Sequence, residues 1–235
     1  MSEGVAASKN MRILMVLKMK TTITAIIILA GFSTAPVARA ALSPQQVIRE
    51  SAEKVRVILR KKVKKGSPAA KQQKEKLKKV VDDFLDYHEL SRRSLGPHWT
   101  ERTSEEQEEF TKLLRDLIEA SYTSTISKNI DFKMEYDDEE IDEDGAQANV
   151  TAVASAKNKK GKTVSEDLTF HLYLKQRSWL IFDVEFGDVS LVRHYRGEFN
   201  RKIKKESYQA LLAAMRKKLD EIRSGKAKAD VKPKL

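Results

Sequence analysis

Apolar residues recur at every third or fourth position between residues 43 and 118, which is the period of an amphipathic helix. Ser43-Pro44 combines an N-cap residue with a proline in the first turn. The apolar face behind it consists of Val47, Ile48, Ala52, Val55, Ile58 and Leu59. Gly66-Ser67-Pro68 breaks this helix, and the stripe of a second one consists of Leu77, Val80, Val81 and Phe84. Thr103 and Glu106 have the spacing of a capping box. They predict a third helix, on which one face is shared by Phe110, Leu113, Leu114, Leu117 and Ile118.

The period then changes from 3.6 to 2, which predicts β-strands. The alternating apolar positions are Ile130, Phe132, Met134 and Tyr136; Ala148, Val150, Ala152 and Ala154; Leu168, Phe170, Leu172 and Leu174; and a stretch over 179–186. The connections over 158–162 and 175–178 are of hairpin length, so we expect an antiparallel meander. Such alternation predicts that one face of the sheet is buried and the other is exposed to solvent.

Two further helical patterns follow the strands. Their apolar positions are Leu191, Tyr195, Phe199 and Ile203, and then Tyr208, Leu211, Leu212, Met215, Leu219 and Ile222. The order of helices, strands and helices predicts an α+β fold, with helices packed over one face of a curved antiparallel sheet of about four strands. We expect a single domain over residues 41–223 and a basic flexible tail over 224–235.

The first forty residues are typical of an export signal. Lys18 and Lys20 precede an apolar run over 23–32, and Ala38-Arg39-Ala40 then supplies the small residues that flank a cleavage position. A transmembrane anchor is the alternative, but the run is well short of the ~20 residues that a bilayer requires. We therefore predict a secretory signal peptide over 1–40, cleaved near Ala40, and an exported mature protein.

The chain has 235 residues, with 45 Lys and Arg against 34 Asp and Glu, a formal net charge of +11, and no cysteine. The lack of cysteine excludes a disulfide scaffold, a cysteine-ligated zinc site and a thiol nucleophile. The basic residues are densest over 54–79, where twelve Lys and Arg stand against one acid, Glu75. No aromatic residues are interleaved for base stacking, so we do not expect nucleic-acid binding. A solvated helix face is one interpretation, and transient contact with an anionic membrane surface or an acidic partner is the other.

The residues that could hold a metal or carry catalysis form no recognised motif. The four histidines, His88, His98, His171 and His194, lack the spacing of metal ligands. The acidic run over 137–145 does not follow the ligand order of a calcium loop, so we interpret it as a solvated hairpin tip. We therefore expect no metal and no cofactor.

Three local motifs occur in order along the chain. They are Leu95-Gly96-Pro97-His98-Trp99, followed by the capped helix with Phe110; Trp179-Leu180-Ile181-Phe182-Asp183-Val184; and Val189-Ser190-Leu191-Val192, followed by Tyr195-Arg196 and Phe199. Over about residues 43–222 the chain resembles the MlaC family of periplasmic phospholipid shuttle proteins, also called toluene-tolerance auxiliary proteins. Asp188 and His194 depart from the Gly and Asn that the family has at these places.

The resemblance implies a soluble periplasmic carrier that is not an enzyme and has bound phospholipid as its cargo, and we expect a monomer. Members of the family carry glycerophospholipid between an outer-membrane lipoprotein–porin complex and an inner-membrane ABC transporter complex, which maintains outer-membrane lipid asymmetry. They hold the acyl tails in an apolar cavity between sheet and helices. Together with strand alternation and helical spacing, this predicts a lipid pocket lined by Leu114, Leu117, Ile118, Tyr122, Phe132, Met134, Val150, Ala152, Phe170, Leu172, Phe182, Val184 and Leu191.

Two other functions are compatible with the same residues. An enzyme on an α+β scaffold could use Asp183 as a base with a raised pKa if this carboxylate lay in an apolar pocket. Alternation places Asp183 on the face opposite Phe182 and Val184, so this interpretation weakens if those two residues point inward. A periplasmic adhesion or scaffold module could instead use the basic segment 54–79 and would have no cavity.

Overall fold

The computed structural model describes residues 42–64, 66–126, 132–157 and 161–226, apart from the side chains of 122–126. The chain divides into two units, Met1–Arg39 and Ala40–Leu235, and only the second contains described residues. The predicted signal peptide and residues 227–235 of the predicted tail therefore lie outside the described residues. Within the described part, no helix combines the length and the apolar character that crossing a bilayer requires.

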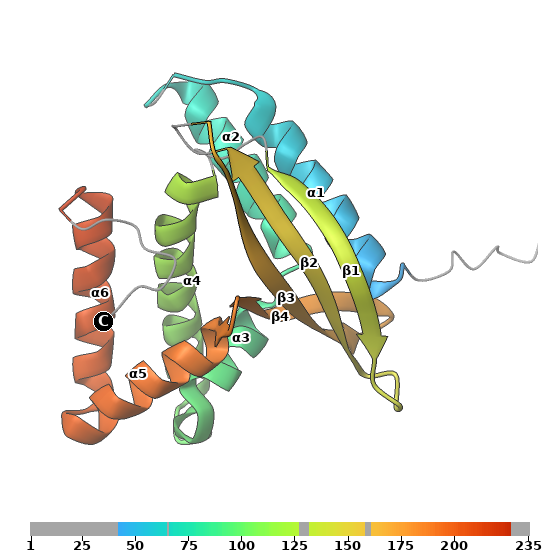
Figure 1. The fold of residues 1–235 in the computed structure, drawn as a ribbon. Coiled ribbons are helices and arrows are strands. Elements are labelled where there is room, and N and C mark those ends of the chain that lie inside the picture. The colour runs from blue at the N-terminus through green and yellow to red at the C-terminus, as the bar shows by residue number, and fades with distance from the viewer. Residues whose placement is uncertain (1–41, 65, 127–131, 158–160, 227–235) are drawn as a thin grey trace, which may run out of the picture. The chain divides into compact units, whose positions relative to one another are not determined.

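The described residues form helices and one antiparallel sheet, as Figure 1 shows. The elements in chain order are α1 (Pro44–Arg60), α2 (Pro68–Asp82), α3 (Tyr87–Leu95), the 3-10 helix η1 (Gly96–Trp99), α4 (Ser104–Ile126), β1 (Lys133–Ile141), β2 (Gln147–Lys157), β3 (Thr163–Lys175), β4 (Ser178–Phe186), β5 (Val189–Ser190), α5 (Leu191–Lys205) and α6 (Tyr208–Arg223). The predicted α+β class is confirmed. The structure adds α3 and the short β5, which no periodic pattern in the sequence predicted.

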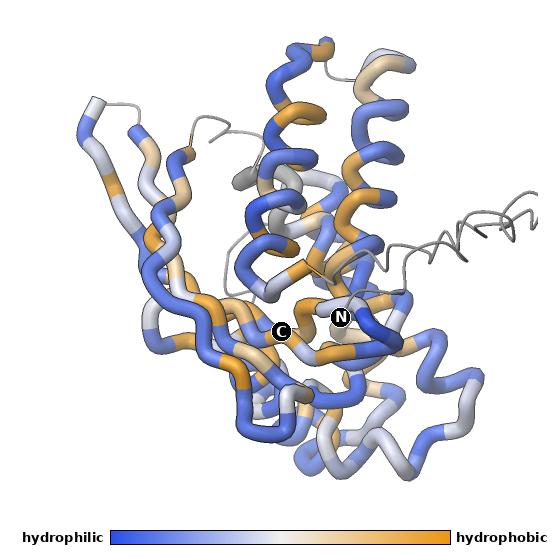
Figure 2. Tube along the Cα trace, turned by 90° about the vertical axis from the view of Figure 1, so that its right-hand side faces the viewer, coloured by the Kyte–Doolittle hydropathy of each residue, from blue (hydrophilic) through white to orange (hydrophobic). Residues whose placement is uncertain are grey.

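The first two helices form an antiparallel hairpin (Figures 1 and 2). Ser43 and Gln46 form a capping box at the start of α1, and Ser67 caps α2 ahead of Pro68. The Gln73 side chain on α2 donates hydrogen bonds of 2.7 and 2.6 Å to the carbonyl oxygens of Ile58 and Lys61, which ties the two helices together. Figure 2 shows both helices as mostly hydrophilic, with apolar positions recurring along each of them.

The sheet is an antiparallel meander with the strand order β1-β2-β3-β4-β5, as the alternation predicts. One of its faces packs against α1, and the buried residues of this first core, which we call the sheet core, are Ile48, Ala148, Val150, Leu172, Trp179 and Ile181. Glu139 on the edge strand β1 accepts hydrogen bonds from the Ser43 hydroxyl at 3.0 Å and the Gln45 amide at 2.5 Å. A carboxylate at the helix N-terminus thus fastens α1 to the sheet.

A β-bulge interrupts the alternation in β4. Leu172 pairs with Ile181 while the preceding residue, His171, pairs with Asp183, so Phe182 is an extra residue with no partner opposite it. Its ring lies beside His171 and Tyr173, on the opposite face of the sheet from the sheet core. The prediction that Phe182 shares a face with Val184 is therefore wrong, because the bulge shifts the phase of the strand by one residue.

A second core, which we call the helical core, lies among α3, α4, α5 and α6. Phe110, Tyr195 and Phe199 are each 0% exposed there, and the ring of Phe199 lies 5.4 Å from Phe110 and 5.3 Å from Tyr195. Leu85 and Val184 are half-buried and contact both cores. The two cores therefore meet at these residues, and a cavity lies at the same place.

Candidate functional site

An apolar cavity of about 230 Å³ opens between α1, α2, α4, the end of β4 and the start of α5. Its apolar lining consists of Val55, Leu77, Val81, Phe84, Leu85, Tyr87, Ile118, Val184, Phe186 and Leu191. Three charged residues complete it, namely Lys74 and Lys78 from α2 and Glu119 from α4. Charged groups avoid apolar interiors, so these three mark the mouth of the cavity, where it meets solvent.

The α2 wall is only partly covered by the rest of the protein. None of its residues is buried, although Leu77, Val80 and Val81 form an apolar stripe along it. Lysines border this apolar stripe on both sides, so the stripe is narrow and offers little apolar surface for another helix to cover. Gln73 ties α2 to α1, and Leu77 and Val81 of the stripe line the cavity.

The C-terminal end of α2 is anchored to the sheet. The segment that follows it forms two backbone hydrogen bonds with β4, from Ile181 N–H to the Phe84 carbonyl at 2.7 Å and from Asp86 N–H to the Ile181 carbonyl at 2.9 Å. Phe84 and Leu85 are thereby held at the floor of the cavity. This end of the wall is tied to the sheet by backbone, whereas the opposite end of α2 leads to the hairpin turn.

A chain of ion pairs joins α2 to α4 beside the mouth. Arg115 on α4 contacts the Asp82 carboxylate of α2 and also donates to Glu119 at 2.8 Å. Lys78 lies 3.8 Å from the same Glu119 oxygen. Burial raises the pKa of the nearby Tyr87, and the Glu119 charge adds to the effect, so the phenol is neutral at physiological pH. Half-exposed pairs of this kind each stabilise by only about 0–1 kcal/mol, so the contact between α2 and α4 is weak.

The structure brings three of the predicted pocket residues, Ile118, Val184 and Leu191, to the cavity wall. Leu114 and Leu117 are instead fully buried in the helical core. The remaining sheet residues belong to the region that α1 covers or to its border: Met134, Val150, Phe170 and Leu172 in or against the sheet core, Ala152 buried on β2, and Phe132 beside Arg56 of α1.

Two of the predicted pocket residues need separate mention. Phe182 lies on the opposite face of the sheet, under the Arg93 guanidinium at 3.7 Å. The Tyr122 side chain is outside the described residues. Lipid contact at these positions, and at the others, stays a prediction.

The sequence reasoning missed the α1 and α2 side of the cavity. The lining residues on this side that were not predicted are Val55, Leu77, Val81, Phe84 and Leu85, and Tyr87 and Phe186 were missed elsewhere on the cavity wall. The available signal was the stripe on α2, because a narrow apolar face with lysines on both sides of it is covered only in part by a core. Such a face is suited to a wall that something else must cover.

Asp183 has a structural role that the enzyme hypothesis did not anticipate. Its side chain is buried and accepts hydrogen bonds from the Val192 amide at 3.0 Å and the Ser190 hydroxyl at 2.5 Å. Ser190 in turn caps α5 through the Arg193 amide at 2.9 Å. Asp183 therefore holds the N-terminus of α5 against β4, and it does not line the cavity.

The polar side chains beside Asp183 on this face of the sheet also have hydrogen-bond or ion-pair partners. His171, Asp183 and Glu185 place potential ligand atoms within 4.8 Å of one another. However, Glu185 lies 3.0 Å from both His171 and Arg193, and Asn149 contacts the other imidazole nitrogen at 2.7 Å. A guanidinium already compensates the carboxylate, so this cluster is interpreted as a structural network rather than a metal centre.

Comparison with known proteins finds a matching family and a similar solved structure. The family model described as MlaC protein matches residues 49–217 of the chain. Among solved structures, the chain is similar to a phospholipid-binding protein from Ralstonia solanacearum in complex with a phospholipid, with a TM-score of 0.64 and 16% sequence identity. The similarity covers 77% of this chain and 99% of the other. A search of curated proteins gives no match.

Proposed function

Because this chain belongs to the MlaC family, we propose that it is a phospholipid carrier that holds acyl tails in the cavity between the sheet core and the helical core. The observation that carries the proposal is the lining, which is apolar throughout except for the charged residues at the mouth. An amphiphile with apolar tails and a charged headgroup matches this distribution. The structural neighbour with bound phospholipid supports the same assignment.

Energetics require that such a carrier bury nearly all of its cargo. Two acyl chains contain on the order of 30 methylenes, each costing ~0.8 kcal/mol in water, so bare tails would cost roughly 24 kcal/mol. A bilayer also buries the tails, so transfer between the bilayer and the protein is close to neutral. Direction must then come from the complexes that load and unload the carrier.

The size of the cavity implies that the wall moves on loading. Its volume of about 230 Å³ lies below the ~300–1,000 Å³ that is usual for pockets of drug-sized ligands, and a phospholipid is larger still. Of the surrounding elements, α2 is the one with no buried residue and with weak ion pairs to α4. We expect α2 to swing outward from its anchored C-terminal end when the tails enter.

The wider role follows from the family. We propose that the mature protein acts in the periplasm as a monomer and shuttles glycerophospholipid between an outer-membrane lipoprotein–porin complex and an inner-membrane ABC transporter complex. No described residue group suggests a catalytic alternative, since the hydrogen bonds of Asp183 to the start of α5 account for its burial. A binding role therefore fits the described residues better than an enzymatic one.

A pair of valine substitutions tests the cavity. Val81→Trp on α2 would fill part of the cavity that the acyl tails are proposed to occupy. Val57→Trp adds the same bulk to α1 at a position that is 60% exposed. We expect the Val81 variant to lose phospholipid in native mass spectrometry while its delipidated form melts close to the wild type. The Val57 variant should keep both properties.

Two outcomes would count against the proposal in different ways. Wild-type protein that carries no phospholipid after incubation with vesicles would refute lipid binding altogether. Equal lipid content in the Val81 and Val57 variants would show that the tails lie elsewhere. Delipidation is needed for the melting comparison because bound ligand itself raises the melting temperature.

A further inference from the structure

Two lysines stand at the mouth of the cavity without adequate counter-charge. Within the described part of the chain, Lys74 forms no ion pair, and Lys78 has Glu119 as its one ion-pair partner, at 3.8 Å. Both are on α2, one turn apart, and both line the cavity together with Leu77. Like charges at this spacing on a helix repel each other, and an anion that contacts both would relieve the repulsion.

The negative charge of Glu119 is neutralised by Arg115 even without Lys78. Arg115 donates to the same carboxylate oxygen at 2.8 Å, a full hydrogen bond, while the contact with Lys78 is longer than one. The Lys78 side chain is 37% exposed, so its ammonium group can turn away from Glu119 at little cost. The pair of lysines is therefore available to a ligand, and Arg115 keeps the carboxylate paired.

Building on the proposed function, we propose that Lys74 and Lys78 form a phosphate site that holds the headgroup of the bound lipid and favours phospholipids with a net negative headgroup. An ammonium group is a compact charge with three donors, which suits a phosphodiester at the rim of a pocket. With the tails against Leu77 and Val81, the phosphate would lie level with the two lysines, which stand on the same face of α2.

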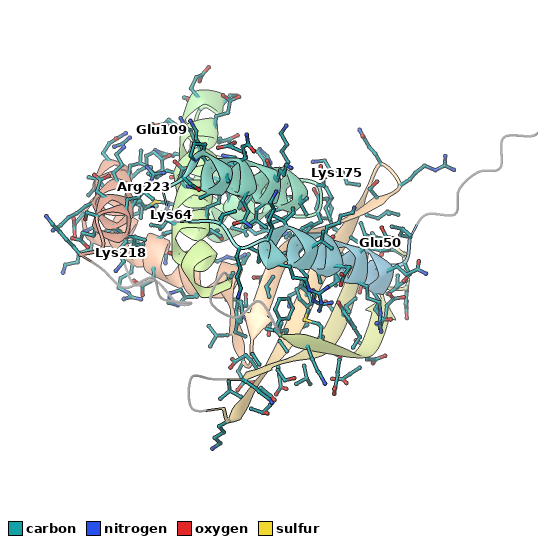
Figure 3. All side chains as sticks on the ribbon, turned by 90° about the horizontal axis from the view of Figure 1, so that it is seen from above. Glu50, Lys64, Glu109, Lys175, Lys218 and Arg223 are labelled. Carbon is teal, nitrogen blue, oxygen red and sulfur yellow. The ribbon has the colours of Figure 1, made fainter. Side chains whose placement is uncertain are left out.

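The rest of the hairpin sharpens this preference. Glu75 is the only acid over 54–79, and the carboxylates beside the mouth, Glu119 and Asp82, are already paired with Arg115, so they offer the cationic amine of a zwitterionic headgroup little compensation. Figure 3 views the molecule from the side of the hairpin turn, where Lys64 is labelled. Because an exposed ion pair contributes about 0.2–1 kcal/mol, we expect each lysine to enrich anionic over zwitterionic lipid by a factor between about 1.4 and 5.

The test measures which lipid is loaded. Delipidated protein is incubated with vesicles of equal parts phosphatidylglycerol and phosphatidylethanolamine, separated from them, and analysed for headgroup and total lipid by mass spectrometry. The variant Lys74→Gln with Lys78→Gln removes the site and keeps helix-forming residues. Lys61→Gln with Lys62→Gln is the matched control, because it removes the same charge from the same hairpin outside the cavity lining.

We expect wild type and the control variant to be enriched in phosphatidylglycerol to the same degree and to load the same total lipid, and the Lys74 and Lys78 variant to load about equal amounts of both lipids. Arginine at both positions should restore the enrichment. Enrichment that survives in the Lys74 and Lys78 variant overturns the site. Enrichment lost equally in the control also overturns it, since the hairpin would then act through contact with the bilayer surface. Wild-type protein that loads no lipid refutes the proposed function itself.

Discussion

The α1–α2 hairpin and the helical core are both built from amphipathic helices, yet they bury their apolar faces to very different degrees. In the helical core Phe110, Tyr195 and Phe199 are 0% exposed, with their rings packed on one another. On α2 no residue is buried at all. The comparison teaches that helical period alone does not decide burial, because the width of the apolar face and the charge beside it decide whether a second layer can cover it.

The largest expected effect separates the two regions by stability. Phe199→Ala in the helical core should lower the free energy of unfolding by about 3–5 kcal/mol, because it leaves a void in a closed core. Leu77→Ala on the cavity wall should cost about 1 kcal/mol or less, since that side chain is only partly buried and borders an open cavity. Urea unfolding of delipidated protein measures both. Equal losses for the two variants would show that the hairpin is packed as tightly as the core.

A second prediction concerns the connection between β4 and the N-terminus of α5, beside the helical core. Asp183→Asn would replace a carboxylate oxygen with an NH₂ group facing donors such as the Val192 amide, so we expect a loss of about 1–3 kcal/mol in unfolding free energy. Asp188→Asn, at an exposed position nearby, is the matched control and should leave stability within about 0.5 kcal/mol. Similar behaviour of the two variants would remove the structural role assigned to Asp183.

The smallest predicted effect lies at Asp86, where the hairpin joins α3. Burial alone would raise the pKa of this carboxyl group, but hydrogen bonds from the Tyr173 hydroxyl, the Glu89 amide and Lys175 outweigh it and lower the pKa below the ordinary value of 3.8. The stability that these contacts supply is therefore present above the unfolded pKa and lost as pH falls through the folded one.

Asp86→Asn should accordingly flatten the decline in melting temperature between about pH 5 and pH 2. The variant should also be less stable than the wild type at pH 7. The Asn side chain has one oxygen that accepts hydrogen bonds and no charge, whereas the carboxylate has two such oxygens and a negative charge. The phenol itself should not contribute, since burial and the hydrogen bond to Asp86 raise the pKa of Tyr173 to about 12. A wild-type melting temperature that does not change over this acid range would contradict the prediction.

Much of the architecture was predictable from local pattern. The capping signals at Ser43 and Thr103, the change of period at the strands and the hairpin-length connections correctly predicted the helices around an antiparallel sheet. Side chains repeat at fixed intervals in each element, so an apolar stripe identifies its element without any knowledge of distant contacts. α3 escaped this reasoning because it has only nine residues, too few to display a clear period.

The chemistry of the cavity was partly readable in the same way. Ile118, Val184 and Leu191 were predicted as lining, and the family was predicted from ordered motifs spread along the chain. The sequence reasoning did not identify which helices form the opposite wall of the cavity. Strand alternation says which side chains share a face, but it does not say which helix covers that face.

The sequence by itself determined most of the elements and their amphipathic faces, because these depend on residues close together in the chain, and its ordered motifs identified the MlaC family. Only the tertiary structure decided that α1 covers the inner face of the sheet, that a bulge turns Phe182 to the other side, and that α2 closes the cavity. These outcomes depend on contacts between distant segments that compete for the same surface. A local pattern supplies the apolar area, and long-range packing selects what covers it.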